Sequence, residues 1–146
     1  MKAKLVTAIA LFGILITAGA CTAANANNAP DQATVEVSID ELMSQKHIEK
    51  QVEVVVGGTL KVTMGSNPST GFSWTEQAQI VDVNILEQTD HEFISPDTDI
   101  PGAAGKDVWT FKALTKGATT ISMEYSRPWE GGEKGEWTFE LTVDVQ

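Results

Sequence analysis

Apolar and polar residues alternate along most of the chain beyond residue 34, with the two-residue period of half-buried β-strands. The clearest segment is 137–145, where an apolar residue at every odd position alternates with a polar one. The pattern predicts a strand over 35–39 and seven core strands after it. The core strands are expected at 51–56, 59–64, 72–77, about 81–94, 106–115, 118–126 and 136–145.

Short breaks separate these strands, and one of them predicts a helix. Gly57-Gly58 is typical of a hairpin turn, and Lys116-Gly117 is typical of a tight reversal. Ser38 followed by Glu41 has the form of a capping box, which predicts a short helix through Lys46. No amphipathic helix of ten residues interrupts the later strands, so β-α-β units are not expected. The chain is therefore predicted to be all-β, an antiparallel β-sandwich of about seven strands.

The N-terminus has the pattern of an export signal. Lys2 and Lys4 precede an uncharged apolar run over 5–17, which is too short to span a membrane comfortably. Small residues at 18–20 then precede Cys21. They fit ordinary signal peptidase cleavage, and they also resemble a bacterial lipobox, although alanine stands where leucine is usual.

Two observations favour lipidation of Cys21, the only cysteine of the chain. It lies at the cleavage point, and an Ala- and Asn-rich stretch typical of a flexible tether follows it. We therefore expect a signal peptide over 1–20, a tether over 21–33 and a folded domain over 34–146. The protein is expected to be exported and lipid-anchored to a bacterial membrane, or otherwise periplasmic or secreted.

The composition removes several classes of function. The chain has 146 residues, two histidines and a formal charge of −10. A single cysteine excludes an internal disulfide framework and a Cys-rich metal site. The excess of 20 acidic over 10 basic residues argues against nucleic acid and against docking on anionic lipid. We expect no catalytic residue, metal or cofactor, no membrane contact except a lipid at Cys21, and a monomer.

The direction of the strands groups the longer loops. If successive strands run antiparallel, every second connection lies at the same end of the sandwich. The loops over 65–71, 96–105 and 127–135 then share one end, and the tight turns share the other. An end that collects the long loops is typical of a binding edge on a rigid scaffold.

Each of these loops has residues suited to contact with another protein. The first holds small hydroxyl residues between a proline that fixes φ and a glycine that tolerates positive φ. The second has almost no side chains, so a partner can approach its backbone. The third combines arginine and tryptophan, which are enriched in interface hot spots, with a rigid proline. The candidate binding residues are Asn67, Pro68, Ser69, Thr70, Gly71, Phe72, Gly102, Ala103, Ala104, Gly105, Arg127, Pro128 and Trp129.

These motifs, in this order and spacing, resemble the chagasin family of inhibitors of papain-like cysteine proteases. The resemblance runs from about Gln51 to the C-terminus and rests on 67–72 followed by Trp74, on 102–105 and on 127–129. It implies an immunoglobulin-like sandwich whose three loops form a wedge across the active-site cleft of the protease.

The resemblance also implies a role for each loop. Residues 67–72 would cover the catalytic cysteine, and this chain has Ser-Thr where the family often has Thr-Thr, which keeps a hydroxyl. Residues 102–105 would lie along the cleft by backbone contact. Residues 127–129 would form the opposite flank, with Trp129 packed on aromatic surface of the enzyme. The segment 33–50 lies outside the motifs and is expected to be no more than an added strand or tether.

Three other interpretations remain open at this point. A generic immunoglobulin-like module that binds a protein or a glycan would have no reason to carry all three motifs. An enzyme would need a nucleophile and a base, but His47 and His91 are isolated and Cys21 lies at the cleavage point. A structural lipoprotein with inert loops would bind no protease at all.

Overall fold

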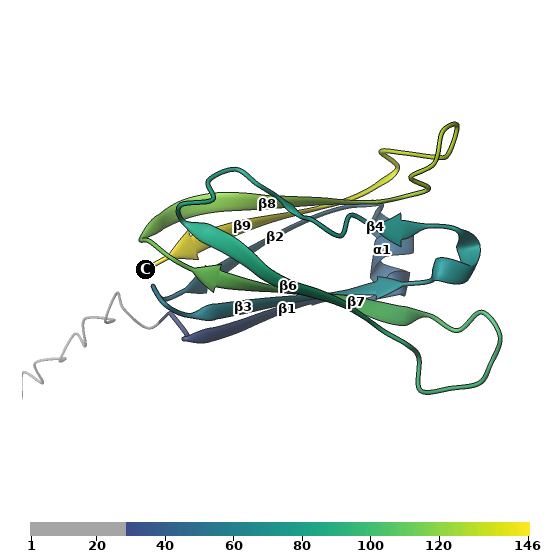
Figure 1. The fold of residues 1–146 in the computed structure, drawn as a ribbon, viewed down its shortest axis with the longest axis horizontal. Coiled ribbons are helices and arrows are strands. Elements are labelled where there is room, and N and C mark those ends of the chain that lie inside the picture. Colours follow the sequence, from purple (N-terminus) through teal and green to yellow (C-terminus); the bar gives the residue numbers. More distant parts are fainter. Residues whose placement is uncertain (1–28) are drawn as a thin grey trace, which may run out of the picture.

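The computed structural model describes residues 29–146, which form two β-sheets packed face to face (Figure 1). The first sheet has the order β1 (Gln32–Val37), β3 (Thr59–Ser66), β7 (Gly105–Ala113) and β6 (Leu86–Ile94). The second has the order β2 (His47–Val54), β9 (Trp137–Val145), β8 (Gly117–Ser126) and β4 (Ser73–Trp74), with β5 (Gln79–Ile80) also paired to β8. The helices are α1 (Ile39–Gln45) and the 3-10 helix η1 (Pro68–Thr70). The predicted all-β sandwich is confirmed.

The alternating pattern buries one face of each strand between the two sheets. In β9, Phe139, Leu141 and Val143 are at most 1% exposed, and the polar residues between them remain accessible. In the other sheet, Trp109 and Phe111 of β7 are fully buried. Burial of one such side chain stabilises the fold by roughly 1.5–3 kcal/mol, so this alternation is the main cause of the architecture.

The connectivity corrects two details of the prediction. Gly57-Gly58 does not close a hairpin, because β2 and β3 belong to different sheets and the turn crosses between them. Strand β3 pairs in parallel with β1, and β2 pairs in parallel with β9, so the sheets are mixed and not wholly antiparallel. The physical reason is local: the N–H of Thr59 donates to the carbonyl of Asp31, so the chain before β1 occupies the edge that a hairpin partner would need.

Two predicted strands are shorter than expected. The strand over 72–77 reduces to β4, and the strand over 81–94 reduces to β6, which a turn separates from the preceding two-residue β5. In that turn the N–H of Asn84 donates to the carboxylate of Asp82 at 2.9 Å, as in an Asx-turn. Val81 and Val83 are 80% and 63% exposed, so their apolar character does not mark a strand.

The predicted short helix is confirmed and gives the segment 33–50 a place in the fold. The hydroxyl of Ser38 accepts the N–H of Glu41 at 3.1 Å, which caps α1. Leu42 is fully buried and anchors the helix to the core. Because α1 joins β1 in the first sheet to β2 in the second, it closes one end of the sandwich.

The predicted export signal over 1–20, Cys21 and most of the predicted tether lie outside the described residues. Gln32 and Ala33, the last two residues assigned to the tether, belong to β1. No helix within 29–146 is long and apolar enough to cross a membrane.

Candidate functional site

Three long connections meet at one end of the sandwich, as the strand directions predicted (Figure 1). We call them the central loop (67–71), the Gly102 loop (95–104) and the Trp129 loop (127–136), and together the wedge. The side-chain amide of Asn67 donates to the carbonyl of Gly102 at 2.9 Å. The guanidinium Nη2 of Arg127 donates to the carbonyl of Thr70 at 3.1 Å. The central loop is therefore bonded to both of its neighbours.

The central loop is also fixed from within. Its backbone forms η1, in which the N–H of Thr70 donates to the carbonyl of Asn67 at 3.1 Å and the N–H of Gly71 to that of Pro68 at 3.0 Å. The N–H of Asn67 donates to the hydroxyl of Tyr125 at 2.9 Å, which ties the loop to β8. Pro68, Ser69 and Thr70 are exposed at its tip. This part of the wedge is ordered before any partner arrives.

Gly71 marks the contact between the central loop and the Trp129 loop. Its φ is +81°, in the left-handed region that side chains rarely adopt. A Cβ at this position would lie 2.7 Å from Cη2 of Trp129, closer than any real contact. Trp129 is nevertheless 52% exposed. One edge of its indole packs on Gly71, and the rest of the ring faces solvent.

Arg127 joins the wedge to the aromatic residues beneath it. Its guanidinium carbon lies 4.5 Å from the centroid of the Phe72 ring, a cation–π geometry. Phe72 is 8% exposed and packs against the rings of Tyr125 and Trp137, with centroids 5.5 and 5.0 Å away. Of the predicted binding residues, Phe72 thus lies under the surface and supports the loop above it.

From residue 102 onward the Gly102 loop carries almost no side chain, whereas residues 97–101 expose theirs. Gly102 is exposed, with φ +79°, and a Cβ there would have no atom within 4 Å. Ala103 and Ala104 are half-buried, and Gly105 is buried at the start of β7. A side chain that the sequence analysis missed is Ile100, which is 69% exposed. The available signal was a lone apolar residue between an aspartate and a proline within a loop.

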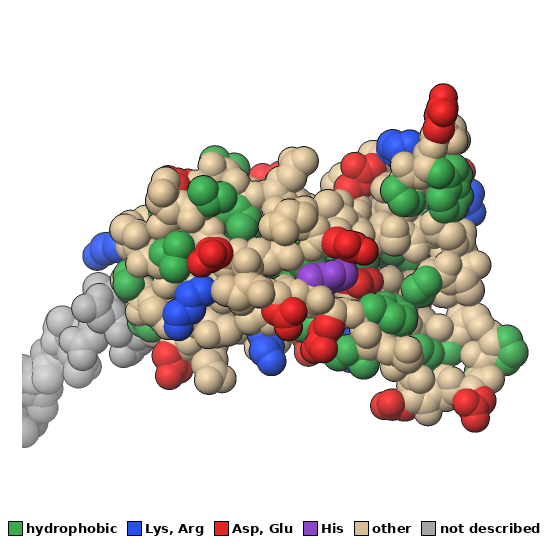
Figure 2. Space-filling view, viewed as in Figure 1, with side chains coloured by type: hydrophobic (Ala, Val, Ile, Leu, Met, Phe, Trp, Pro, Cys, Tyr) green, Lys and Arg blue, Asp and Glu red, His purple; other side chains and the backbone are tan. Residues whose placement is uncertain are grey.

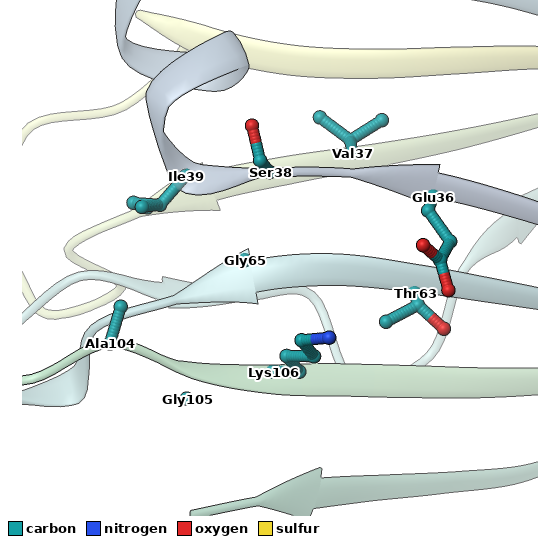
Figure 3. Close-up of a pocket in the computed structure, with 9 residues that line it drawn as sticks. All are labelled: Glu36, Val37, Ser38, Ile39, Thr63, Gly65, Ala104, Gly105 and Lys106. Atoms are coloured by element: carbon teal, nitrogen blue, oxygen red, sulfur yellow. The ribbon is translucent and has the colours of Figure 1, made fainter. Parts of the chain in front are cut away.

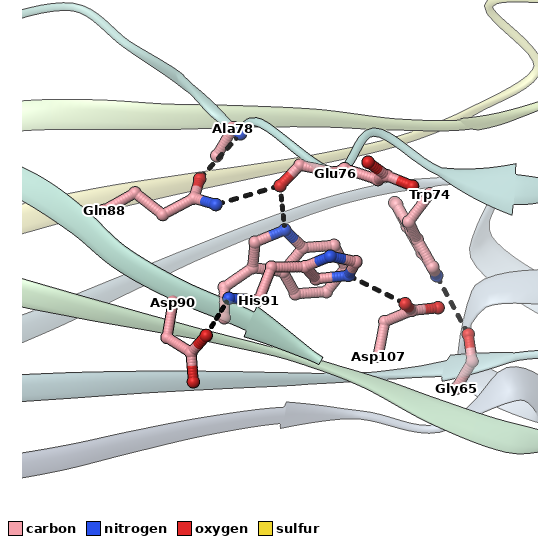
Figure 4. A network of polar contacts seen from close by, with 9 residues as sticks. Gly65, Trp74, Glu76, Ala78, Gln88, Asp90, His91 and Asp107 are labelled. Carbon is pink, nitrogen blue, oxygen red and sulfur yellow. Dashed lines mark hydrogen bonds and ion pairs between the residues drawn. The ribbon is translucent and has the colours of Figure 1, made fainter. Parts of the chain in front are cut away.

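A polar network fixes the strands beneath the wedge (Figure 4). The indole N–H of Trp74 donates to the carbonyl of Gly65 at 3.0 Å, and that of Trp109 donates to the carbonyl of Glu76 at 3.0 Å. Nε2 of His91 lies 2.8 Å from a carboxylate oxygen of Asp107. His91 belongs to β6 and His47 to β2, so both histidines lie outside the wedge. His91 has a structural partner in Asp107.

Two hollows flank α1 at the base of the wedge. One, of about 250 Å³, lies between β1 and the start of β7 and is lined by Glu36, Val37, Ser38, Ile39, Thr63, Gly65, Ala104, Gly105 and Lys106 (Figure 3). The other, of about 370 Å³, lies between α1 and the central and Trp129 loops.

Acidic and apolar side chains gather over the ends of the loops (Figure 2), among them the exposed Asp97, Asp99, Ile100, Trp129 and Glu130.

The comparison with protein families decides between the open interpretations. The profile described as "Chagasin family peptidase inhibitor I42" matches residues 53–143, more than half of the chain. The chain belongs to the chagasin family of peptidase inhibitors. The match contains the whole wedge, whereas β1, α1 and most of β2 precede it. It favours an inhibitor over an enzyme or a generic binding module, as the motifs predicted.

Individual relatives agree with this assignment. Chagasin of Trypanosoma cruzi is 26% identical over 94 residues, which cover 61% of this chain and 83% of that protein. The crystal structure of the cysteine protease inhibitor EhICP2 from Entamoeba histolytica matches with a TM-score of 0.60 at 22% identity, over 81% of this chain and all of that one. PbICP-C, solved in complex with falcipain-2, matches with a TM-score of 0.62 at 16% identity, over 78% and 99%. The fold is thus the immunoglobulin-like sandwich of these inhibitors.

Proposed function

We propose that this protein inhibits papain-like cysteine proteases reversibly, by inserting the wedge into the active-site cleft. The observation that carries the proposal is the bonding of the central loop to both flanking loops, in a chain of the chagasin family. The solved relative PbICP-C binds falcipain-2, a protease of the papain-like class. A wedge of three loops can supply the roughly 800 Å² per partner of a standard interface.

The inhibition requires occlusion and no chemistry from the inhibitor. The hydrogen bonds of η1 and the fixed φ of Pro68 hold the tip in a closed turn, so the protease meets no extended segment to cleave. Because the loops are ordered in the free protein, little conformational entropy is lost on binding, and more of the contact energy becomes affinity.

Each loop has a part in this proposal. Pro68, Ser69 and Thr70 would cover the catalytic cysteine, since they are the exposed tip of the central loop. The backbone around Gly102 would lie along one side of the cleft. The exposed face of Trp129 would pack on the other side, with Gly71 and Arg127 holding its loop in position.

An inhibition assay tests the proposal. Residues 22–146 should inhibit papain reversibly with nanomolar-class affinity. Trp129→Ala should weaken inhibition by about 30-fold, because truncation of a hot-spot tryptophan costs on the order of 2 kcal/mol. Its thermal unfolding should match the parent, since the side chain is half exposed. Absence of inhibition at micromolar concentration, or a Trp129→Ala variant as potent as the parent, would contradict the proposal.

We further propose that the mature chain is a monomer held to a bacterial membrane by a lipid on Cys21. The first described residues lie beside the turn at Gly57-Gly58, at the opposite end of the sandwich from the wedge, so an anchor there would leave the loops free. In cell fractionation, the full chain should be found with membranes and Cys21→Ser in the soluble fraction. A Cys21→Ser chain that stays with membranes would exclude this anchor. Sedimentation of the soluble variant should give the mass of one chain.

A further inference from the structure

The larger hollow at the base of the wedge is a mainly apolar groove that extends from the predicted contact residues to α1, which is not among them. Its volume is about 370 Å³, and it lies between α1, the central loop and the Trp129 loop. The apolar wall consists of Ile39, Met43, Phe72 and Trp137. The rest of the lining consists of Asn67, Thr70 and Arg127 of the wedge and Tyr125 of β8. The groove is therefore continuous with the surface proposed to meet the protease.

Met43 is the unusual residue of this groove. It is 42% exposed, whereas Met64 and Met123 are almost fully buried. The helix that carries it is already anchored by Leu42, so packing of the core does not require an apolar residue at position 43. Methionine is flexible and polarisable and adapts to different apolar surfaces, which suits a contact with a partner.

The position of α1 decides what can reach the groove. The helix packs against β2 and β3 at the end of the sandwich where η1 forms the tip (Figure 1). When the tip enters a cleft, the walls of that cleft extend back along the wedge, so their rim comes to lie at its base. The rim of the protease cleft is thus the surface that would face Met43.

The chemistry of the groove favours an apolar occupant. Its one charged side chain, Arg127, already donates to the carbonyl of Thr70, lies over the ring of Phe72 and approaches the carboxylate of Glu133 at 4.0 Å. A charged side chain entering the groove would lose its hydration without gaining a free partner. An apolar one would bury surface against four apolar residues.

We propose that this groove is a fourth contact of the inhibitor, which receives an apolar side chain from the rim of the target's cleft. The inference rests on the proposed protease inhibition and adds to it a contact by α1, which lies outside the segment matched by the family profile. Binding would then use α1 in addition to the three loops, and targets with an apolar rim residue would be preferred.

Inhibition of papain by two matched variants tests this inference. Met43→Asp should inhibit about tenfold more weakly than the parent, because it places a charge in an apolar contact. Leu114→Asp is the control, since Leu114 is 41% exposed and follows β7 at the opposite end of the sandwich. It should stay within about twofold of the parent. Met43→Ala adds no charge, so its inhibition of papain should lie between that of Met43→Asp and that of Leu114→Asp. Thermal unfolding should show that all three variants are folded.

The outcomes separate this inference from the proposed function. If the parent does not inhibit papain, the proposed function fails. If the parent inhibits and Trp129→Ala weakens it, but both Met43 variants match the parent, the wedge stands and the fourth contact is overturned.

Oxidation of Met43 gives a second readout. Peroxide should convert it to the sulfoxide in the free chain, and complex formation with a papain variant whose catalytic cysteine is alanine should protect it. Met64 and Met123 are internal controls, since burial protects them in both states. Equal oxidation of Met43 in both states overturns the proposal. Protection in the free chain, together with the mass of a dimer, also overturns it and assigns the groove to a second copy of the chain.

Discussion

The two ends of the sandwich use the same backbone conformation for different purposes. Gly57 comes just before β3 and Gly71 soon after it, and both have a φ of +81°. A Cβ at Gly57 would have no atom within 4 Å, whereas one at Gly71 would collide with Trp129. Positive φ therefore marks a turn at both positions, but of these two glycines only Gly71 also allows a close contact through its missing side chain. The two positions differ in their surroundings and not in their backbone conformation.

The core between the two ends should support both equally, and its disruption has the largest expected effect. Trp109 is fully buried, donates to the carbonyl of Glu76 and stacks on His91 at 4.8 Å. Trp109→Ala should lower the free energy of unfolding by about 3–5 kcal/mol, measured by denaturant titration. Papain inhibition per folded molecule should stay near the parent value. A selective loss of inhibition would show that the core is coupled more tightly to the wedge than to the opposite end.

The paired substitutions Gly71→Ala and Gly57→Ala test the comparison directly. Each should lower the free energy of unfolding by roughly 1–2 kcal/mol, because alanine is strained at positive φ. Gly71→Ala should also weaken papain inhibition about tenfold or more, since the new Cβ displaces the Trp129 indole. Gly57→Ala should leave inhibition within about twofold of the parent. Equal inhibition by the two variants would mean that the contact between Gly71 and Trp129 does not position the loop.

Much of this contrast between the ends could be predicted from the sequence, because it depends on local signals. Alternation located β8 and β9, the Ser38 cap located α1, and reversal of successive strands placed the three loops together. Pairing between distant segments could not be predicted in this way. A strand that alternates correctly can join either sheet, and the parallel pairs β1–β3 and β2–β9 depend on the edges left free by the other strands.

The local sequence pattern also could not predict which residues of the site are buried and which are exposed. Phe72 and Trp129 are both aromatic residues of loop motifs, yet one is 8% and the other 52% exposed. The difference arises from packing between loops, since the ring of Phe72 meets Tyr125 and Trp137 from distant strands. The groove beside Met43 likewise appears only when α1 and the two loops are brought together.

A last comparison lies within the wedge end itself, at its base, where Trp74 and Trp137 differ in their hydrogen bonds and Trp137 has the smallest expected effect. The indole N–H of Trp74 donates to the carbonyl of Gly65, whereas that of Trp137 is buried and has no acceptor among residues 29–146. Trp74→Phe should therefore lower the free energy of unfolding by about 1–3 kcal/mol, because it leaves a buried carbonyl without its donor.

Trp137→Phe removes a buried N–H that forms no hydrogen bond, which stabilises the fold. This gain offsets the packing contacts that are lost because the phenyl ring is smaller than the indole. We expect the free energy of unfolding to change by no more than about 0.5 kcal/mol, measured by denaturant titration. A loss for Trp137→Phe as large as that for Trp74→Phe would mean that the indole N–H of Trp137 has a partner in solution. The base of the wedge would then be held by a hydrogen bond in addition to the packing of Trp137 on Phe72.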